Sequence, residues 1–381
     1  MPKPNTAQLD EIQALNMLSP KARRNISRII PFGLIWLVSG WVFTIVEWAV
    51  IGGPDNLPST VIHMDLQIFI FSSLAIMAVG LLVGTIELVY LNDVLAKKSL
   101  AKKILYKLLI YILFFFAIIL ITFPLAASLE LNTNILDKRV WDKYFSYLTS
   151  MAHLSTLLQL GAALVTSLFY AEISDNIGHG VLINFFTGKY HKPIEENRIF
   201  LFLDMKSSTT IAEQLGHIRY FELLREYYAG MSDAIVQYAG EIYQYVGDEI
   251  IVSWKYESGI ANNNCIRCFF AMKESLRERA GWFEQHFGLA PTFKAGLHFG
   301  RVTTGEIGEL KKEIIFTGDV LNATARIQGL CNTFGVSLLL SADLVDSLDL
   351  GAEFQASSLG KKELRGKEED LELYTITRTK D

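Results

Sequence analysis

The sequence predicts an α+β protein in which an N-terminal bundle of four transmembrane helices is followed by a ferredoxin-like domain with a βαββαβ order. Two observations lead to this prediction. Of the 381 residues, 51% are hydrophobic, and the apolar residues are concentrated before residue 173, whereas the charged residues are concentrated after it. The second region alternates short apolar runs with helical periodicity, which is typical of a sheet packed against helices. We therefore expect two regions that have different solvents.

Four long apolar segments occupy the first region. Each has at least the ~20 residues that a helix needs to cross the hydrocarbon core of a bilayer. The segments cover residues 29–51, 66–91, 104–127 and 148–170. The sequence therefore predicts a cytoplasmic N-terminal segment over residues 1–28 and a four-helix transmembrane domain over residues 29–172.

The distribution of basic residues predicts the orientation of these spans. Four basic residues precede the first apolar segment: Lys21, Arg23, Arg24 and Arg28. The second and third segments are separated by the basic stretch "NDVLAKKSLAKK", so both groups lie on the side that the positive-inside rule assigns to the cytoplasm. On the other side, "GPDNLPSTVIHMD" has no Lys or Arg, although the loop before the fourth segment carries Lys138, Arg139 and Lys143. We expect both termini to be cytoplasmic.

Four polar residues within the spans leave several interpretations open: Glu47, Glu87, His153 and Gln159. They are compatible with a proton path, a ligand-sensing pocket or, for His153, a haem ligand. The structural alternative is that both Glu residues lie near span ends, where water is close, and that Gln159 forms hydrogen bonds between helices. A transporter or channel is a competing class of function, but four helices without an internal repeat supply little pathway.

Residues 173–197 are predicted to connect the two regions. The first part of this segment has apolar residues at helical spacing, and Gly188 and Pro193 then end the pattern. The apolar residues are Ile173, Ile177, Val181 and Phe185. We interpret the segment as a helical connector that carries a signal, and a plain linker remains the alternative because the apolar stripe is short.

The domain predicted over residues 198–378 begins with six elements that are visible in the periodicity. Strands are expected at 198–204, on both sides of a Gly247-Asp248 turn within 240–254, and at 292–300, and helices at 217–238 and 261–280. Their order is βαββαβ, the ferredoxin-like arrangement. The Gly-Asp pair is a two-residue hairpin signal, and in this order the hairpin can lie beside the first strand.

The first strand, "RIFLFLD", ends in an acidic residue. Burying the carboxylate of Asp204 is costly unless a cation or several hydrogen bonds offset the cost. The predicted hairpin places Asp248 near the end of this strand. Two carboxylates at one sheet edge suit hard cations, which prefer oxygen ligands. Each residue alone also has an ordinary explanation, as a helix cap or a turn residue.

The second region resembles a class III adenylate/guanylate cyclase catalytic domain of the membrane-bound, bacterial type in four blocks that follow the family's order: "FLFLDMKSSTTIAEQLG", "YQYVGDEIIVSW", "AGLHFGRVTTGEIG" and "IIFTGDVLNATARIQ". The resemblance covers about residues 199–376. It implies that Asp204, Asp248 and the backbone carbonyl of Met205 hold two Mg²⁺ (or Mn²⁺) ions on the triphosphate of a nucleotide. It also implies that Asn322 and Arg326, which share one helix face, stabilise the transition state.

The resemblance assigns nucleotide-binding residues as well, and here the sequence departs from the family's pattern. The positions that read the base are matched by Gln244 and Ile315, which fit neither the Lys with Asp or Thr of adenylyl cyclases nor the Glu with Cys of guanylyl cyclases. Thr317 shares a strand face with Ile315 and can contribute a hydroxyl. Arg365 falls where the family keeps a phosphate-binding Lys, and Lys367 is close enough to substitute. Because a Gln amide both donates and accepts, both purines remain open.

The function that this resemblance implies is conversion of ATP to 3′,5′-cyclic AMP and pyrophosphate by a homodimer. Pairing is expected through the catalytic domain, the connector and the transmembrane bundle. We favour ATP by analogy with bacterial membrane cyclases. GTP, with cyclic GMP as the product, is the alternative substrate, and a sensor with an inactive nucleotide-binding domain is the alternative class of protein.

Charge, cysteine content and hydropathy indicate which partners, cysteine roles and location to expect. The net charge of -5 gives no basic footprint, so nucleic acid is not an expected partner. The C-x-x-C pair of Cys265 and Cys268 lies in a predicted helix, and we interpret it as packing in a reducing cytoplasm. The expected location is the bacterial inner membrane, in which the chain is an integral, multi-pass protein.

Overall fold

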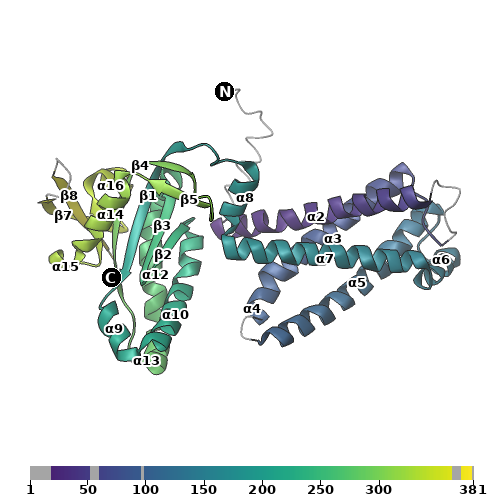
Figure 1. Cartoon of the computed structure of the whole chain (residues 1–381), viewed down its shortest axis with the longest axis horizontal. Coiled ribbons are helices and arrows are strands. Elements are labelled where there is room, and N and C mark those ends of the chain that lie inside the picture. The colour runs from purple at the N-terminus through teal and green to yellow at the C-terminus, as the bar shows by residue number, and fades with distance from the viewer. Residues whose placement is uncertain (1–18, 52–59, 96–97, 363–369, 380–381) are drawn as a thin grey trace. The chain divides into compact units, whose positions relative to one another are not determined.

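The computed structural model describes residues 19–51, 60–95, 98–362 and 370–379. Residues 22–183 form one compact unit, which is helical, and the chain from residue 184 onward forms most of a second unit, which is built around a β-sheet (Figure 1). Each unit has its own core.

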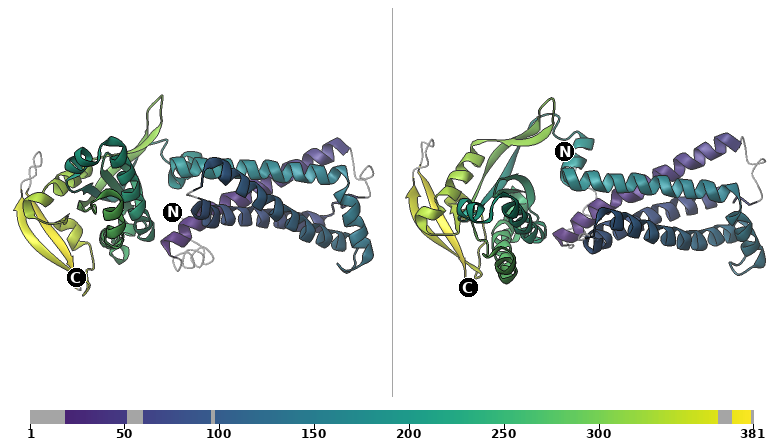
Figure 2. Two further views of the ribbon diagram at one scale, coloured as in Figure 1. Left: turned by 90° about the horizontal axis from the view of Figure 1, so that it is seen from below. Right: turned by 60° about the horizontal axis from the view of Figure 1, so that its bottom comes forward.

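The helical unit contains the four long helices that the hydropathy predicts (Figures 1 and 2). They are α2 (Pro20–Ile51), α3 (Leu66–Thr85) with a π-helical continuation (Ile86–Leu91), α5 (Leu100–Glu130) and α7 (Met151–Ile177). The short helices α4 (Asn92–Leu95) and α6 (Lys138–Leu148) lie between them in the chain. Each long helix is apolar and long enough to cross a membrane.

Two predicted boundaries in this unit need correction. The fourth long helix begins at Met151 rather than at residue 148, because the Ser150 side chain caps it by accepting a hydrogen bond from the His153 N–H at 3.3 Å. The predicted helix through residues 173–185 is interrupted. Helix α7 ends at Ile177, Gly178 adopts a φ of +93°, and α8 (His179–Thr187) follows.

The core of the helical unit is aromatic and closely packed. Phe32, Trp36 and Tyr111 are buried, and the Trp36 Nε1–H donates to Ser167 Oγ at 2.8 Å. The carboxylate of Glu87 is also buried, where it accepts a hydrogen bond from the Tyr111 hydroxyl at 2.7 Å and forms an ion pair with a Lys of the next long helix. Glu87 therefore forms a contact between helices and is not placed in water at the end of its span.

The second unit contains an eight-stranded sheet. Its strands are β1 (Ile194–Met205), β2 (Glu241–Val246), β3 (Glu249–Lys255), β4 (Phe293–Ile307), β5 (Glu313–Thr317), β6 (Leu338–Ser341), β7 (Phe354–Lys362) and β8 (Leu371–Arg378). The strand order is β2-β3-β1-β4-β6-β8-β7, and β5 pairs with β4 outside this path. All pairs are antiparallel except β4 with β6.

The predicted βαββαβ order is confirmed by β1, α10 (His217–Gln237), β2, β3, α12 (Asn264–Glu278) and β4. The remaining helices are α9 (Ser208–Leu215), α11 (Tyr256–Ile260), α13 (Ala280–Phe287), α14 (Asp319–Gly329), α15 (Cys331–Phe334) and α16 (Ala342–Asp346). Strand β1 begins at Ile194, before the predicted residue 198, because its polar first residues pair with β4 rather than pack in the core. The arm formed by β4 and β5 projects from the sheet (Figure 2).

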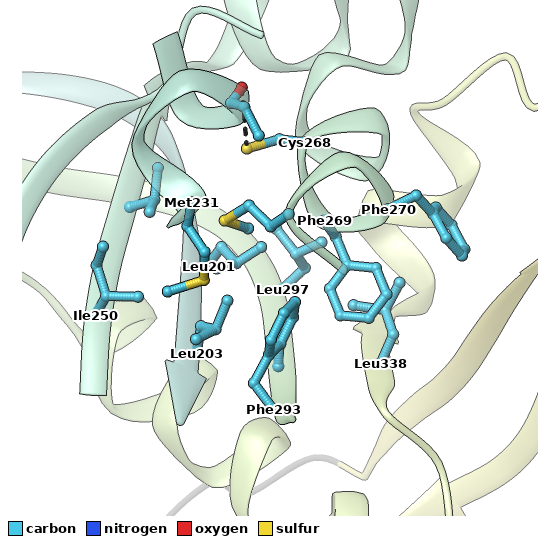
Figure 3. Close-up of a cluster of buried hydrophobic side chains, with 14 of the residues drawn as sticks. Leu201, Leu203, Met231, Ile250, Cys268, Phe269, Phe270, Phe293, Leu297 and Leu338 are labelled. Atoms are coloured by element: carbon cyan, nitrogen blue, oxygen red, sulfur yellow. Dashed lines mark hydrogen bonds between the residues drawn. The ribbon is translucent and has the colours of Figure 1, made fainter. Parts of the chain in front are cut away.

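Helices α10 and α12 cover one face of the sheet with the main hydrophobic core. Leu201 and Leu203 of β1 pack there with Met231 and Phe269 (Figure 3). Cys268 is a free thiol in the same core, buried beside the backbone carbonyl of Ala234. Alternate residues of β1 thus fill this core, as the period of a strand requires.

The opposite face of β1 carries Phe200, Phe202 and Asp204, and α14 packs against it. Glycine at position 296 of β4 permits this approach, because a Cβ there would lie 2.5 Å from the backbone nitrogen of Gln328 in α14. A helix that carries polar side chains is therefore held directly over the end of β1.

Candidate active site

Asp204 lies near the end of β1, at the centre of the candidate site. The pairing of the strands places it opposite Glu249 of β3 on one side and Lys294 of β4 on the other. Paired residues of neighbouring strands point to the same face of a sheet, so these three side chains share the face on which α14 packs. The Asp204 side chain keeps 27% of its surface exposed.

Asp248 lies in the turn between β2 and β3, as the hairpin signal predicts. Gly247 precedes it with a φ of +63°, a conformation that strains other residues. The Tyr228 hydroxyl, which comes from α10, donates a hydrogen bond to the Gly247 carbonyl at 2.8 Å. The turn is thus fixed from the helical layer, and it holds Asp248 at the end of the sheet.

The side chains of Asp204 and Asp248 lie close enough to interact electrostatically. Burial and the neighbouring Asp248 carboxyl raise the pKa of Asp204, and Lys294, whose Nζ lies 3.4 Å from Asp204 Oδ2, opposes this rise. The Gln328 amide donates to the same oxygen at 3.3 Å. Burial and the two Asp carboxylates raise the pKa of Glu249 to about 7. Among the described residues, Lys294 is the one cation in contact with these three carboxyl groups, so negative charge exceeds positive charge there.

A divalent cation fits this arrangement. Asp248 Oδ2 is buried and has no hydrogen-bond partner among the described residues, which is costly for a carboxylate oxygen. Among all the residues that the structure describes, no group of three or more His, Cys, Asp or Glu side chains is placed to hold a metal ion. Two carboxylates are nevertheless a sufficient protein share for Mg²⁺, which keeps water and substrate phosphates as its other ligands.

Met205, whose backbone carbonyl the resemblance assigns to the metal, is the last residue of β1 and follows Asp204 directly. Its side chain is buried in the main core. The buried side chain anchors the end of the strand and leaves only the main chain as a source of a ligand at this position.

Asn322 and Arg326 lie one helical turn apart on α14. Asn322 is exposed, and the Arg326 Nη1 is buried without a hydrogen-bond partner in the described chain. Within one chain, no hydrogen bond among the described residues joins either side chain to Asp204 or Asp248. The structure therefore brings the two Asp residues together, but it does not join them to the Asn-Arg pair.

The residues expected to read the base lie on β2 and β5. Gln244 is exposed on β2, and its side chain has no hydrogen bond in the part of the chain that the structure describes. Ile315 is half-buried on β5, and the exposed Thr317 donates its hydroxyl to the Thr303 carbonyl at 3.3 Å. The expected phosphate-binding residues Arg365 and Lys367 lie outside the described residues.

The two strands that carry the base-reading positions are joined by an aromatic contact. The rings of Tyr243 and Phe316 lie 4.7 Å apart, and the Tyr243 hydroxyl accepts a hydrogen bond from the Phe316 N–H at 3.3 Å. Gln244 follows Tyr243 in β2, and Ile315 and Thr317 flank Phe316 in β5. This contact fixes the backbone beside all three positions.

Three residues of the site were not predicted from the sequence: Glu249, Lys294 and Gln328. Lys294 lies within the predicted strand at 292–300, but only the register between β1 and β4 shows that it faces Asp204. Gln328 follows the predicted Asn-Arg pair on α14, and its contact depends on how closely that helix approaches β4.

Comparison with known proteins identifies the domain. Residues 190–378 match the family model of the adenylate and guanylate cyclase catalytic domain. The match confirms the resemblance of the four sequence blocks to the catalytic domain of class III adenylate/guanylate cyclases.

The relatives of the chain include two curated proteins. Adenylate cyclase 2 of Rhizobium meliloti (strain 1021) is 37% identical over 229 residues, which are 59% of this chain and 63% of that protein. The adenylate cyclase of Anabaena cylindrica is 27% identical over 183 residues, which are 46% of this chain and 36% of that protein. The chain thus spans less than two thirds of the length of these relatives. A bacterial light-regulated adenylyl cyclase of known structure is 24% identical, with a TM-score of 0.43, over 48% of this chain and 91% of that chain.

Proposed function

We propose that the chain is a membrane-anchored adenylate cyclase that converts ATP to 3′,5′-cyclic AMP and pyrophosphate in a homodimer. The observation that carries the proposal is the proximity of the Asp204 and Asp248 carboxyls, in a domain that matches the cyclase catalytic domain. One oxygen of this pair, Asp248 Oδ2, is buried and has no partner in the described chain. The names of the two curated relatives support ATP as the substrate.

The reaction forms a bond between the ribose 3′-oxygen and the α-phosphorus and breaks the bond from the α-phosphorus to the pyrophosphate oxygen. The 3′-hydroxyl gives its proton to water, and pyrophosphate leaves with the electron pair of the broken bond. Two Mg²⁺ (or Mn²⁺) ions, when bound, supply charge neutralisation at the triphosphate and acidify the 3′-hydroxyl. Asp204, Asp248 and the Met205 carbonyl are the residues that would hold them.

The other residues of the site orient these ligands and the substrate. Lys294 and Gln328 both contact Asp204 Oδ2 and thereby fix the direction of its carboxylate. Arg326 would donate its unpaired Nη1–H group to the α-phosphate, where negative charge develops in the transition state. Asn322 would orient the ribose from the same helix face. Gln244, Ile315 and Thr317 would surround the base, and Arg365 and Lys367 would bind the phosphates.

Exposed apolar side chains support a second copy of the chain as the partner. Strand β2 is an edge of the sheet, and it exposes Ile242, Tyr245 and Val246. The tip of the β4–β5 arm exposes Ile307 and Leu310. An unpaired apolar edge is a surface that proteins commonly cover with another chain. A two-fold dimer would bring the Asn-Arg pair of one copy to the Asp pair of the other, and it would form two equivalent sites.

We also propose the arrangement of the whole chain. The four apolar helices support insertion into a membrane, and the basic residues at their ends support cytoplasmic termini in a bacterial inner membrane. The transmembrane domain then covers residues 29–172, the connector 173–197 and the catalytic domain 198–378. The connector and the bundle would pair in the homodimer together with the catalytic domain.

Turnover of the purified full-length chain tests the function. With Mn²⁺ present, ATP should give cyclic AMP and pyrophosphate in equal amounts, and GTP should react more slowly. Faster formation of cyclic GMP would instead establish a guanylate cyclase. Absence of both products, from protein that still binds nucleotide, would establish the inactive sensor.

Base selectivity gives a second test. If Gln244 contacts the purine, Gln244→Lys should favour ATP and Gln244→Glu should favour GTP. Each new side chain would form a polar contact with one base and would remain unpaired beside the other base. The expected change in the ratio of kcat/KM values corresponds to about 1–3 kcal/mol. Gln355→Lys and Gln355→Glu, on the far edge strand β7, are the matched controls. An unchanged ratio in both Gln244 variants would assign base reading to other residues.

A further inference from the structure

The helical unit contains a partly open cavity of about 260 Å³, whose wall includes Tyr147 of α6 and Ala152 near the start of α7. The long helices and α6 all contribute to its wall. The wall is mostly apolar, with side chains such as Ile76, Ile119 and Phe123, and it includes the polar side chains of Tyr147 and Gln159. A concave apolar wall with a few polar groups is typical of sites for small organic molecules.

Among the described residues of this wall, Glu47 is the one carboxylate. Glu47 is exposed, as are its hydrophobic chain neighbours Val46 and Trp48, so this part of α2 belongs to the apolar surface of the bundle. A charged group at such a position is costly unless a partner of opposite charge accompanies it.

Other carboxylates of the helical unit have such partners. Ion pairs join Glu87 to Lys107, Glu130 to Lys143 and Asp175 to Arg28. Within the described part of the chain, the side chain of Glu47 has neither an ion pair nor a hydrogen bond. The described residues of the wall include no Lys, Arg or His, so a bound cation would supply the positive charge that suits Glu47.

We propose that this cavity binds a small organic cation with an apolar body, whose ammonium group pairs with Glu47. The apolar wall takes the body of the molecule, and Tyr147 and Gln159 offer hydrogen bonds near its polar end. A bare metal ion suits the cavity poorly, because hard cations require six or more oxygen ligands and this wall offers one carboxylate. An anion would be repelled by Glu47.

The test compares two probes of equal shape on the full-length protein in detergent micelles. 2-Phenylethylamine is cationic at neutral pH, and 2-phenylethanol is its neutral counterpart. The concentration dependence of the thermal unfolding temperature gives an affinity for each probe. The wild-type protein should bind the amine at least tenfold more tightly than the alcohol. Equal affinities for the two probes, or tighter binding of the alcohol, would overturn the proposal without any variant.

Three variants test the residues. Glu47→Gln should reduce the affinity for the amine to that for the alcohol, whereas Glu172→Gln, a change to an exposed carboxylate of α7 away from the cavity, should leave the tenfold preference intact. Ala75→Leu, which places a larger side chain on the cavity wall, should weaken the binding of both probes. An unchanged preference for the amine in Glu47→Gln would show that the ammonium binds elsewhere.

Discussion

Replacing Asp204 or Asp248 with Asn is expected to lower cyclic nucleotide production by at least about 100-fold, because each change removes a charged ligand of the proposed cations. Asn has nearly the same shape as Asp, so packing is retained. The measurement is turnover of ATP by the purified full-length variants with Mn²⁺. Asp343→Asn, a change to an exposed residue of α16, is the matched control and should keep wild-type turnover.

Stability separates loss of chemistry from loss of folding in these variants. Burial and the Asp248 carboxyl raise the pKa of Asp204, which means that the folded protein disfavours the ionised form of this group. Removing the charge should therefore leave the free energy of unfolding no lower than that of the wild type in the absence of metal. A lower free energy of unfolding would contradict the proposed electrostatic effect of Asp204. Near-normal turnover would contradict the proposed mechanism.

Mixing two inactive chains is expected to restore activity. Asp204→Asn removes one half of the proposed site, and Asn322→Ala removes the other. A mixed dimer would contain one intact site, formed by the Asp pair of one chain and the Asn-Arg pair of its partner. If chains mix at random, half of the dimers are mixed and each has one of two sites intact, so turnover should return to about a quarter of the wild-type value.

A cis double variant provides the control for this experiment. Chains that carry both Asp204→Asn and Asn322→Ala should not restore activity when mixed with Asp204→Asn chains, because every possible site then lacks Asp204. Co-purification through two different affinity tags measures the amount of mixed dimer. Mixed dimers of the two single variants that remain inactive would mean that each chain holds its own complete site.

The order of elements in the catalytic domain follows from local sequence patterns. The alternation in β1 and the Gly247-Asp248 turn each have a local physical cause, so the sequence predicts the hairpin and its place beside the first strand. The contacts of Lys294 and Gln328 with Asp204 depend on strand register and on the close approach of α14 at Gly296. Sequence periodicity specifies neither, because both arise from tertiary packing.

The same limit applies to the helical unit. Hydropathy alone predicts the four long helices, because length and composition suffice for that. Which groups surround Glu47 and Glu87 depends on how the helices pack against one another. Lys107, which pairs with Glu87, lies on the next long helix, whereas Glu47 faces a cavity. The sequence therefore allows the same interpretations for Glu47 and Glu87, although the structure gives the two residues different surroundings.

Binding of Mn²⁺ tests most directly the claim that Asp204 and Asp248 form a cation site for a nucleotide. The full-length protein is titrated with Mn²⁺ in the presence of 3′-deoxy-ATP, which lacks the attacking hydroxyl, and free Mn²⁺ is followed by electron paramagnetic resonance. Wild-type protein should bind Mn²⁺ at least about tenfold more tightly than Asp204→Asn or Asp248→Asn. Equal Mn²⁺ affinity in the three proteins would contradict the account.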